Sequence, residues 1–261
     1  MLRIVADLGN SRLKWGRLGP DGGLRETLVL PTGETDAWER AWAGWDRAGA
    51  GAAESSWAIA TVNPPLAARL AEFLDRRGVS RTRWFRSAAD VPIRHDLDQP
   101  ETAGADRALA VAASIARRES TPEPENKRDR PGLVVSCGTA ITVERITGEG
   151  VWEGGAIAPG LGLSARALHL LTAQLPLVLP TETPRAWGRS TRPALEAGIF
   201  WSAVGAVREL VARQAEGLSP SPWLTWTGGD ASLLAPWVHW EGSRVVPDLV
   251  LEGLARLAFG P

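Results

Sequence analysis

The 261-residue sequence has no tyrosine, one cysteine, one methionine and three histidines. Its single cysteine, Cys137, excludes an intrachain disulfide and any metal site built from several cysteines. The histidines are scattered without the spacing of metal ligands, and no Cys-His-Asp arrangement indicates a nucleophilic enzyme. Cys137 is therefore expected to be a small buried residue.

Long apolar runs are also missing. None approaches the roughly 18 residues that span a bilayer, and Asp7 interrupts the opening apolar run too early for a signal peptide. The net charge of −1 argues against a role driven by charge at nucleic acid or at a membrane surface. We therefore expect a cytoplasmic protein that binds neither nucleic acid nor membrane.

Lysine is almost absent, since only Lys14 and Lys127 occur among the 29 basic residues. The others are arginines, most of which are expected to lie on solvated faces. Lys127 is in a polar segment where any residue would serve, whereas Lys14 follows the motif DLGNS. A compact ammonium group at that position indicates a chemical requirement for lysine.

The sequence has two halves of similar organisation. Each opens with a strand, a glycine turn and two further strands, and then alternates helices with strands. Between them, the segment RESTPEPENKRDRPG is charged and lacks apolar periodicity. The pattern predicts an α/β fold with domains at 1–117 and 132–261, joined by an exposed linker or loop at 118–131. The cleft between the halves is the expected ligand site.

Two glycine turns carry groups suited to phosphate. DLGNS follows the first strand of one half, and SCGTAIT follows the first strand of the other. Gly9 and Gly138 allow close backbone approach or a positive φ, and backbone N–H groups in such turns bind anions. Nearby hydroxyls and Lys14 reach phosphate oxygens, and Asp7 can hold Mg²⁺ through water. The turn TGGD at 227–230 is a third candidate, able to approach a base or ribose.

Either turn alone would be read as an ordinary turn, but their joint occurrence at matching strand ends indicates phosphate handling. The pattern is not a Walker P-loop, because G-x-x-x-x-G-K-[ST] is absent. Asp106 opens the predicted helix in GADRALA, where an acid favours the helix dipole. Its alternative role is a general base toward an alcohol, with Arg107 suited to a substrate carboxylate.

The sequence resembles the type III pantothenate kinases, which include the Bvg accessory factors and belong to the actin/Hsp70/sugar-kinase superfamily. The ordered motifs that carry the resemblance are DLGNSRLKWG, GADR, SCGTAITVE, EGGAIAPG and STRPALEAG. The first resembles the phosphate hairpin D-x-G-N-[ST]-x-x-K of this family. GADR resembles G-x-D-R, whose Asp is the catalytic base, and SCGTAITVE resembles D-x-G-T-A-x-T-x-D.

The resemblance implies two ribonuclease-H-like, actin-like ATPase domains that transfer phosphate from ATP to pantothenate. The products are 4'-phosphopantothenate and ADP, in the first committed step toward coenzyme A. It also implies Mg²⁺, a monovalent cation (K⁺ or NH4⁺), and a homodimer with its sites near the subunit interface.

The same resemblance assigns residues to roles. The implied catalytic base is Asp106, and Asp7 is the position for Mg²⁺ held through water. The implied ATP-binding residues are Asp7, Leu8, Gly9, Asn10, Ser11, Arg12, Leu13, Lys14, Gly138, Thr139 and Thr142. The implied substrate-binding residues are Leu97, Gly104, Ala105, Asp106, Arg107 and Thr191.

The chain departs from the family pattern at two positions. Ser136 occupies the place of an Asp associated with the monovalent cation, so a weaker cation requirement is expected. Glu144 keeps an acid later in the same hairpin. Leu97 occupies the place of a Tyr that contacts pantothenate. These departures leave two alternatives open: a non-catalytic regulatory paralogue that binds nucleotide or pantothenate, and a kinase for another small alcohol.

Overall fold

The computed structural model describes residues 2–47, 54–120 and 129–260, so Lys127 and most of the predicted linker lie outside the described residues. The chain divides into two compact units, each described here by itself. The first comprises Met1–Ile93, Asp98–Ala116 and Leu249–Pro261, and the second comprises Arg94–Leu97 and Arg117–Asp248.

The first unit is built on a five-stranded sheet with the order β3-β2-β1-β4-β5. The first three strands form antiparallel hairpins, and β4 and β5 run parallel to β1. Its elements are β1 (Arg3–Leu8), β2 (Leu13–Leu18), β3 (Leu24–Leu30), α1 (Thr35–Arg47), β4 (Ser56–Thr61), α2 (Pro64–Asp75), β5 (Arg81–Phe85), the 3-10 helix η2 (Ala88–Asp90), α3 (Ala105–Glu119) and α7 (Leu249–Phe259).

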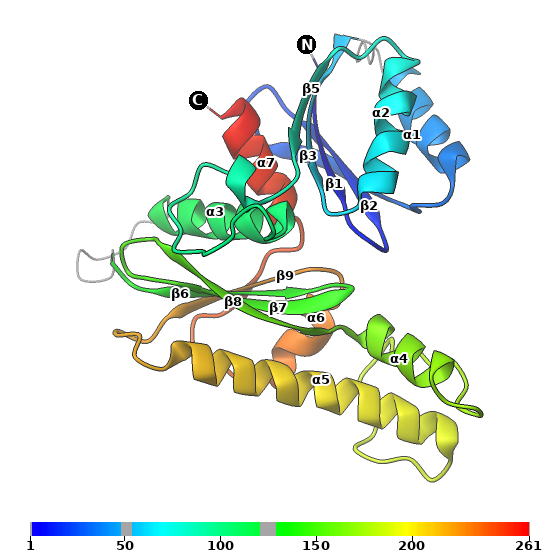
Figure 1. The fold of residues 1–261 in the computed structure, drawn as a ribbon, viewed down its shortest axis with the longest axis vertical. Helices are drawn as coiled ribbons and strands as arrows, with labels where there is room; N and C mark the ends of the chain where they lie inside the picture. Colours follow the sequence, from blue (N-terminus) through cyan, green and yellow to red (C-terminus); the bar gives the residue numbers. More distant parts are fainter. Residues whose placement is uncertain (1, 48–53, 121–128, 261) are drawn as a thin grey trace. The chain divides into compact units, whose positions relative to one another are not determined.

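One face of this sheet packs against α1 and α2 (Figure 1). Trp38 and Trp45 of α1 are buried, and Trp42 packs against the same core, which confirms the core role predicted from their helical spacing. Trp15 and Trp57 meet edge to face with ring centroids 5.1 Å apart. Such aromatic pairs add about 0.5–1.5 kcal/mol beyond the apolar area that they bury.

The other face of the first sheet carries Val5 and Asp7, because side chains alternate along a strand and Ile4, Ala6 and Leu8 face the helices. α7 packs on this second face. A Cβ on Gly16 of β2 would lie 3.3 Å from Leu251 of α7. The face that holds Asp7 is therefore bordered by the C-terminal helix.

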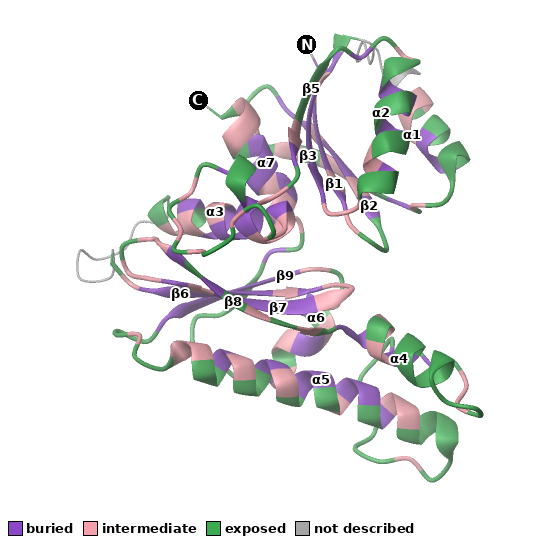
Figure 2. Cartoon of the chain, in the orientation of Figure 1, coloured by how far each residue is buried: buried purple, intermediate pink, exposed green. Residues whose placement is uncertain are grey.

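The second unit is built on a sheet with the order β10-β9-β6-β7-β8. Its elements are β6 (Gly132–Cys137), β7 (Ala140–Ile146), β8 (Trp152–Pro159), α4 (Leu161–Leu170), α5 (Thr191–Ala215), β9 (Trp223–Thr227), α6 (Ala231–Leu234), the 3-10 helix η4 (Ala235–Trp237) and β10 (Arg244–Val245). Figure 2 shows a buried stripe along α5, and this stripe packs on the sheet with α6. Cys137 lies in this core, as predicted.

The face of the second sheet opposite this core is polar. Ile141 and Val143 enter the core, so Thr142 and Glu144 of the same strand face the other way. The buried polar side chains on that face are Thr142, Glu144, Thr225 and Thr227. Buried polar side chains on this face could form hydrogen bonds with a bound ligand.

The two compact units differ from the predicted boundaries at 117/118 and 131/132 in where they place residues 94–97 and α7. Residues 94–97 join the second unit, because the Asp96 backbone N–H donates to the Trp152 carbonyl and the Trp152 backbone N–H donates to the Arg94 carbonyl. The helix α7 joins the first unit. The helix expected over LGLSARALHLLTAQL ends at Leu170. No helix among the described residues is long and apolar enough to cross a membrane.

Candidate active site

The turn between β1 and β2 brings Asp7 and Lys14 together. The two residues are direct cross-strand partners in the antiparallel pair, and their side chains share one face of the sheet. Gly9 donates a backbone hydrogen bond to the Arg12 carbonyl at 3.1 Å and closes the turn. Asn10, Ser11 and Arg12 are exposed at its tip.

Gly9 and Gly138 differ in why they are glycine. The described glycines with positive φ do not include either, so the positive-φ explanation is excluded for both. A Cβ on Gly9 would lie 3.2 Å from the Arg12 carbonyl oxygen, a tight contact within the turn. A Cβ on Gly138 would meet nothing nearer than 3.8 Å. Contacts in the described part of the second unit therefore do not require glycine at 138.

Asp106 lies in the first turn of α3, where its carboxylate accepts a hydrogen bond from the Arg107 backbone N–H at 2.9 Å. A Cβ on Gly104 would lie 2.4 Å from Asp106 Oδ1. The glycine of GADR therefore makes room for the carboxylate. The helix-dipole role is present, because the acid lies at the helix N-terminus. In addition, the negative charge of Asp106 raises the pKa of Asp7.

The carboxylates of Asp7 and Asp106 are coupled. Burial, followed by the negative charge of Asp106, raises the pKa of Asp7 from 3.8 to about 7, and Lys14 opposes the shift. Two acids and one lysine thus form one electrostatic group on a single unit. A carboxyl group with such a pKa accepts a cation readily, because a nearby positive charge relieves the repulsion.

This group fits Mg²⁺ held largely through water and phosphate. The described residues contain no cluster of three or more His, Cys, Asp or Glu side chains placed around a metal. Mg²⁺ commonly uses one or two protein carboxylates together with waters and substrate phosphates. Asp7, with the negative charge of Asp106 nearby, therefore provides a carboxylate of the expected kind.

The second hairpin is held by backbone packing from two other glycines. Gly160, which follows β8, donates to the Thr139 carbonyl at 3.0 Å, and its Cβ would lie 2.2 Å from the Gly138 carbonyl. Gly228 has a φ of +93°, and a Cβ on this residue would lie 2.3 Å from the Cys137 carbonyl oxygen. Asp230 donates its backbone N–H to the Cys137 carbonyl at 3.0 Å. The TGGD turn thus supports the hairpin directly.

A row of three hydroxyl residues crosses the polar face of the second sheet. Ser136 pairs with Thr142 on one side and with Thr227 on the other. Thr142 is 8% exposed, and its Oγ1 has no hydrogen-bond partner among the described residues. A buried hydroxyl without a partner costs free energy, so this atom is a candidate for contact with a bound ligand.

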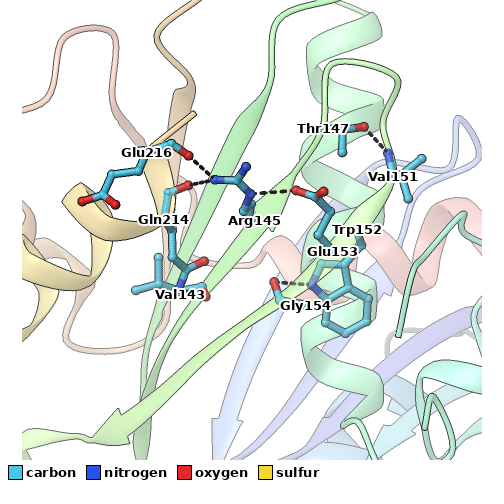
Figure 3. A network of polar contacts seen from close by, with 9 residues as sticks. All are labelled: Val143, Arg145, Thr147, Val151, Trp152, Glu153, Gly154, Gln214 and Glu216. Carbon is cyan, nitrogen blue, oxygen red and sulfur yellow. Dashed lines mark hydrogen bonds and ion pairs between the residues drawn. The ribbon is translucent and has the colours of Figure 1, made fainter. Parts of the chain in front are cut away.

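Glu144 lies in the adjacent row of the same face and is engaged locally. The indole N–H of Trp152 donates to Glu144 Oε2 and to the Gly154 carbonyl, both at 3.1 Å. Figure 3 shows the surrounding polar network, in which Arg145 contacts Glu153 at 2.7 Å and the Gln214 and Glu216 carbonyls of the α5 end. This network fixes the strand pair that carries Glu144.

The donor set around Ser136 does not match a cation site that depends on a carboxylate. Ser136, Thr142 and Thr227 offer neutral oxygens, and the nearest acid on the strand is held by Trp152. Neutral oxygens attract a monovalent cation far less than a carboxylate does.

The remaining predicted residues belong to both units. Leu97 belongs to the second unit and lies near Gly154, whereas 104–107 belong to the first unit. Thr191 is exposed at the beginning of α5. The sequence analysis quoted Gly160 and Thr227 within motifs but gave neither a role at the hairpin, to which the structure ties both. The Pro-Gly pair after β8 and the alternating threonines of β9 were the available signals.

Comparison with known families shows which family the chain belongs to. Residues 3–213 match the family of type III pantothenate kinases. The chain belongs to this family. A type III pantothenate kinase of Alkalilimnicola ehrlichii is 36% identical over 261 residues, covering 98% of this chain and 97% of the relative. The type III pantothenate kinase of Akkermansia muciniphila is 33% identical over 260 residues, covering 100% of this chain and 99% of the relative. The family resemblance of the motifs is confirmed.

Two solved structures share the fold, each with a TM-score of 0.59. One, from Campylobacter jejuni and described as a Baf family transcriptional activator, is 17% identical and covers 97% of this chain and 96% of its own. The other, from Sinorhizobium meliloti and assigned as a 2-dehydro-3-deoxygalactonokinase, is 15% identical and covers 99% of both chains. These likenesses concern the fold alone, and they agree with the predicted pair of ribonuclease-H-like domains.

Proposed function

We propose that this chain transfers the γ-phosphate of ATP to the primary hydroxyl of pantothenate, forming 4'-phosphopantothenate and ADP, the first step of coenzyme A biosynthesis. Membership of the type III pantothenate kinase family over residues 3–213 carries this proposal. The coupled Asp7, Lys14 and Asp106 support it, because phosphate transfer needs charge neutralisation and an oriented hydroxyl.

Asp106 is proposed as the catalytic base. Its carboxylate accepts the hydroxyl proton of the alcohol as the oxygen attacks phosphorus, and before that it orients the hydroxyl. Gly104 leaves space for the carboxylate and Arg107 donates a backbone hydrogen bond to it. These neighbours fix the direction of the group that touches the substrate.

Asp7 and Lys14 are proposed to act on the phosphate chain. The Lys14 ammonium group binds phosphate oxygens. Asp7 holds Mg²⁺ through water, and the nearby negative charge of Asp106 adds to the attraction for the cation. When bound, the metal neutralises charge on the phosphates. The other proposed ATP contacts are Leu8–Leu13, Gly138, Thr139 and Thr142. The partnerless Thr142 Oγ1 is the best-supported contact of the second hairpin.

Substrate contacts are proposed at Gly104, Ala105, Arg107, Leu97 and Thr191. A guanidinium group suits the carboxylate of pantothenate, which supports Arg107. Leu97 offers apolar contact in place of a phenol. We further propose that the activity depends little on K⁺ or NH4⁺, since the row around Ser136 is neutral. A cytoplasmic location stays a prediction.

A homodimer with its sites near the interface is also proposed. Most of the exposed large apolar side chains of the described chain fall in one stretch: Ile157, Leu163, Leu168, Leu170, Leu171, Leu177, Leu179 and Trp187. Exposed apolar groups concentrated in this way mark interaction surfaces. Sedimentation of Leu171→Asp, with Val29→Asp as control, tests this: only the first change should yield monomers.

A coupled ADP-release assay with pantothenate tests the activity. We expect pantothenate-dependent ADP formation in both K⁺ and Na⁺ buffers, and a product with the mass of phosphopantothenate. Asp75→Asn, an exposed change on α2, is the matched control for Asp106→Asn. ADP release that ignores pantothenate but responds to another small alcohol would favour the alternative kinase. Nucleotide binding without turnover would favour the regulatory paralogue.

A further inference from the structure

A cavity of about 390 Å³ lies in the first unit between α2 and the edge strand β5. It opens beside the carboxyl ends of β4 and β5, which run parallel to each other. Ligands of open α/β sheets bind at this kind of position. The volume falls within the range of small-molecule sites, at its lower end.

This cavity is distinct from the group around Asp7. Thr61, which lines the cavity, shares its face of the sheet with Trp57 and Ile59, both in the core under α2. Asp7 points to the opposite face, where α7 packs. A molecule in the cavity would therefore contact neither Asp7 nor Lys14.

The walls of the cavity are largely apolar, and part of its space exists because the helix residues that line it have small side chains. Ala67, Ala68 and Ala71 of α2 lie along one wall, and Trp84 of β5 lies along another. Small residues at these helix positions leave a space beside the indole ring. The walls suit the apolar body of a ligand.

Two hydrogen-bond donors at the cavity lack acceptors in the described part of the chain. The Arg86 guanidinium lies over the Trp84 ring, 5.5 Å from its centroid, and makes neither a hydrogen bond nor an ion pair with a described residue. The half-buried Trp84 indole N–H likewise has no acceptor among the described side chains and carbonyls. The Thr61 hydroxyl, by contrast, is engaged with the Asn63 backbone.

We propose that this cavity binds a small molecule composed of an apolar body and a carboxylate. The guanidinium is planar and can bind a carboxylate in a bidentate manner, and the alanines and the indole contact the body. A cationic ligand is excluded by the charge of Arg86. Arg86 is exposed, so a neutral ligand can bind without pairing this charge, but only a carboxylate gains the interaction with it.

Hexanoate is the probe for a binding test by calorimetry on the full chain, with hexanamide as its neutral counterpart. We expect saturable hexanoate binding with a Kd of about 1 mM or below, and binding of hexanamide at least about tenfold weaker. Arg86→Gln should weaken hexanoate binding by about tenfold or more, while Arg40→Gln, an exposed change on α1, should leave it unchanged.

Ala68→Leu fills the cavity from the opposite wall and keeps the test available if the Arg86 variant does not fold. We expect this change to abolish hexanoate binding while pantothenate-dependent ADP release persists. Absence of hexanoate binding, equal binding of hexanamide, or retained binding in Ala68→Leu or in folded Arg86→Gln each overturns the proposal. None of these results bears on the kinase activity, which is measured separately.

Discussion

Asp7 and Asp106 lie close enough for the charge of one to raise the pKa of the other, although one ends a strand and the other begins a helix almost a hundred residues later. Lys14, the cross-strand partner of Asp7, offsets only part of this repulsion. The first unit therefore holds an excess of negative charge where the phosphate chain and its metal are proposed to bind.

The first prediction concerns stability in the absence of metal. In the folded protein Asp7 has a pKa of about 7, whereas the ordinary value is 3.8. Between these pH values the folded state holds a proton that the unfolded state has released, so stability falls as pH rises through this window. Asp7→Asn should remove the fall and raise the melting temperature above pH 7, with little change at pH 4. Melting curves in a chelator from pH 4 to 8 check this, with the exposed change Asp75→Asn as the control.

The second prediction concerns the proposed base. Asp106→Asn keeps the shape of the side chain but cannot accept the hydroxyl proton, so turnover should fall by two or more decades, in line with the ~10²–10⁴-fold contribution of such bases. Pantothenate-dependent ADP release, with circular dichroism as a check of folding, measures the effect. Near-normal turnover in the folded variant would remove Asp106 from the mechanism.

The third prediction concerns Lys14. Lys14→Arg keeps the charge, but the planar guanidinium is wider than an ammonium group and the tight turn beside Asp7 has little room for it. The KM for ATP should rise by roughly tenfold, which corresponds to about 1.4 kcal/mol. Arg40→Lys on the surface of α1 is the reciprocal control. An unchanged ATP dependence would make Lys14 an ordinary surface lysine.

The fourth prediction concerns the contact between the TGGD turn and the second hairpin. In Gly228→Ala, a Cβ would lie 2.3 Å from the Cys137 carbonyl at a φ of +93°. Backbone clash and left-handed strain together should destabilise the protein by about 3 kcal/mol or more. Gly217→Ala, at a φ of +75° with open space around it, isolates the strain alone and should cost about 1–2 kcal/mol. Urea unfolding compares the two, and equal losses would mean that the contact is unimportant.

The sequence predicted the architecture well because alternation and helical spacing reflect burial directly. The strands around Asp7 and Cys137 and the helix with Trp38 and Trp45 appear where the periodicity predicts them. The placement of α7 in the first unit was missed, since an amphipathic pattern does not indicate which sheet the helix packs on. Long-range choices of this kind depend on shape complementarity that a local pattern does not contain.

The candidate site was predictable in its residue types and less so in its interactions. Asp7, Lys14 and Asp106 stood out in the sequence, but their mutual electrostatic effect depends on distances in the fold. The sequence showed only that Glu144 keeps an acid in the hairpin, and the structure shows its carboxylate bonded to the Trp152 indole. The sequence contains both residues but no sign that they meet.

The last prediction concerns Ser136 and the monovalent cation. The hydroxyl row of Thr227, Ser136 and Thr142 offers oxygens without charge, and the attraction of a cation depends chiefly on charge. The rate of the unmodified protein should therefore change little when K⁺ replaces Na⁺ at fixed ionic strength. Ser136→Asp should create a K⁺ dependence, because the new carboxylate lies beside the two threonine hydroxyls. Ser136→Asn, which adds similar volume without charge, is the matched control and should leave the response flat.

Glu144 decides how an unexpected result is interpreted. Its side chain is almost fully buried and its Oε2 accepts the hydrogen bond of Trp152, so we expect it to contribute little to a cation beside Ser136. Glu144→Gln should consequently leave the response to K⁺ unchanged, although it loses a charged acceptor and lowers stability. A steep K⁺ requirement in the unmodified protein that Glu144→Gln abolishes would show that the charge has moved along the hairpin. A steep requirement that survives Glu144→Gln would instead place the charge on another residue, such as one from a second subunit, and either result would refute a neutral site.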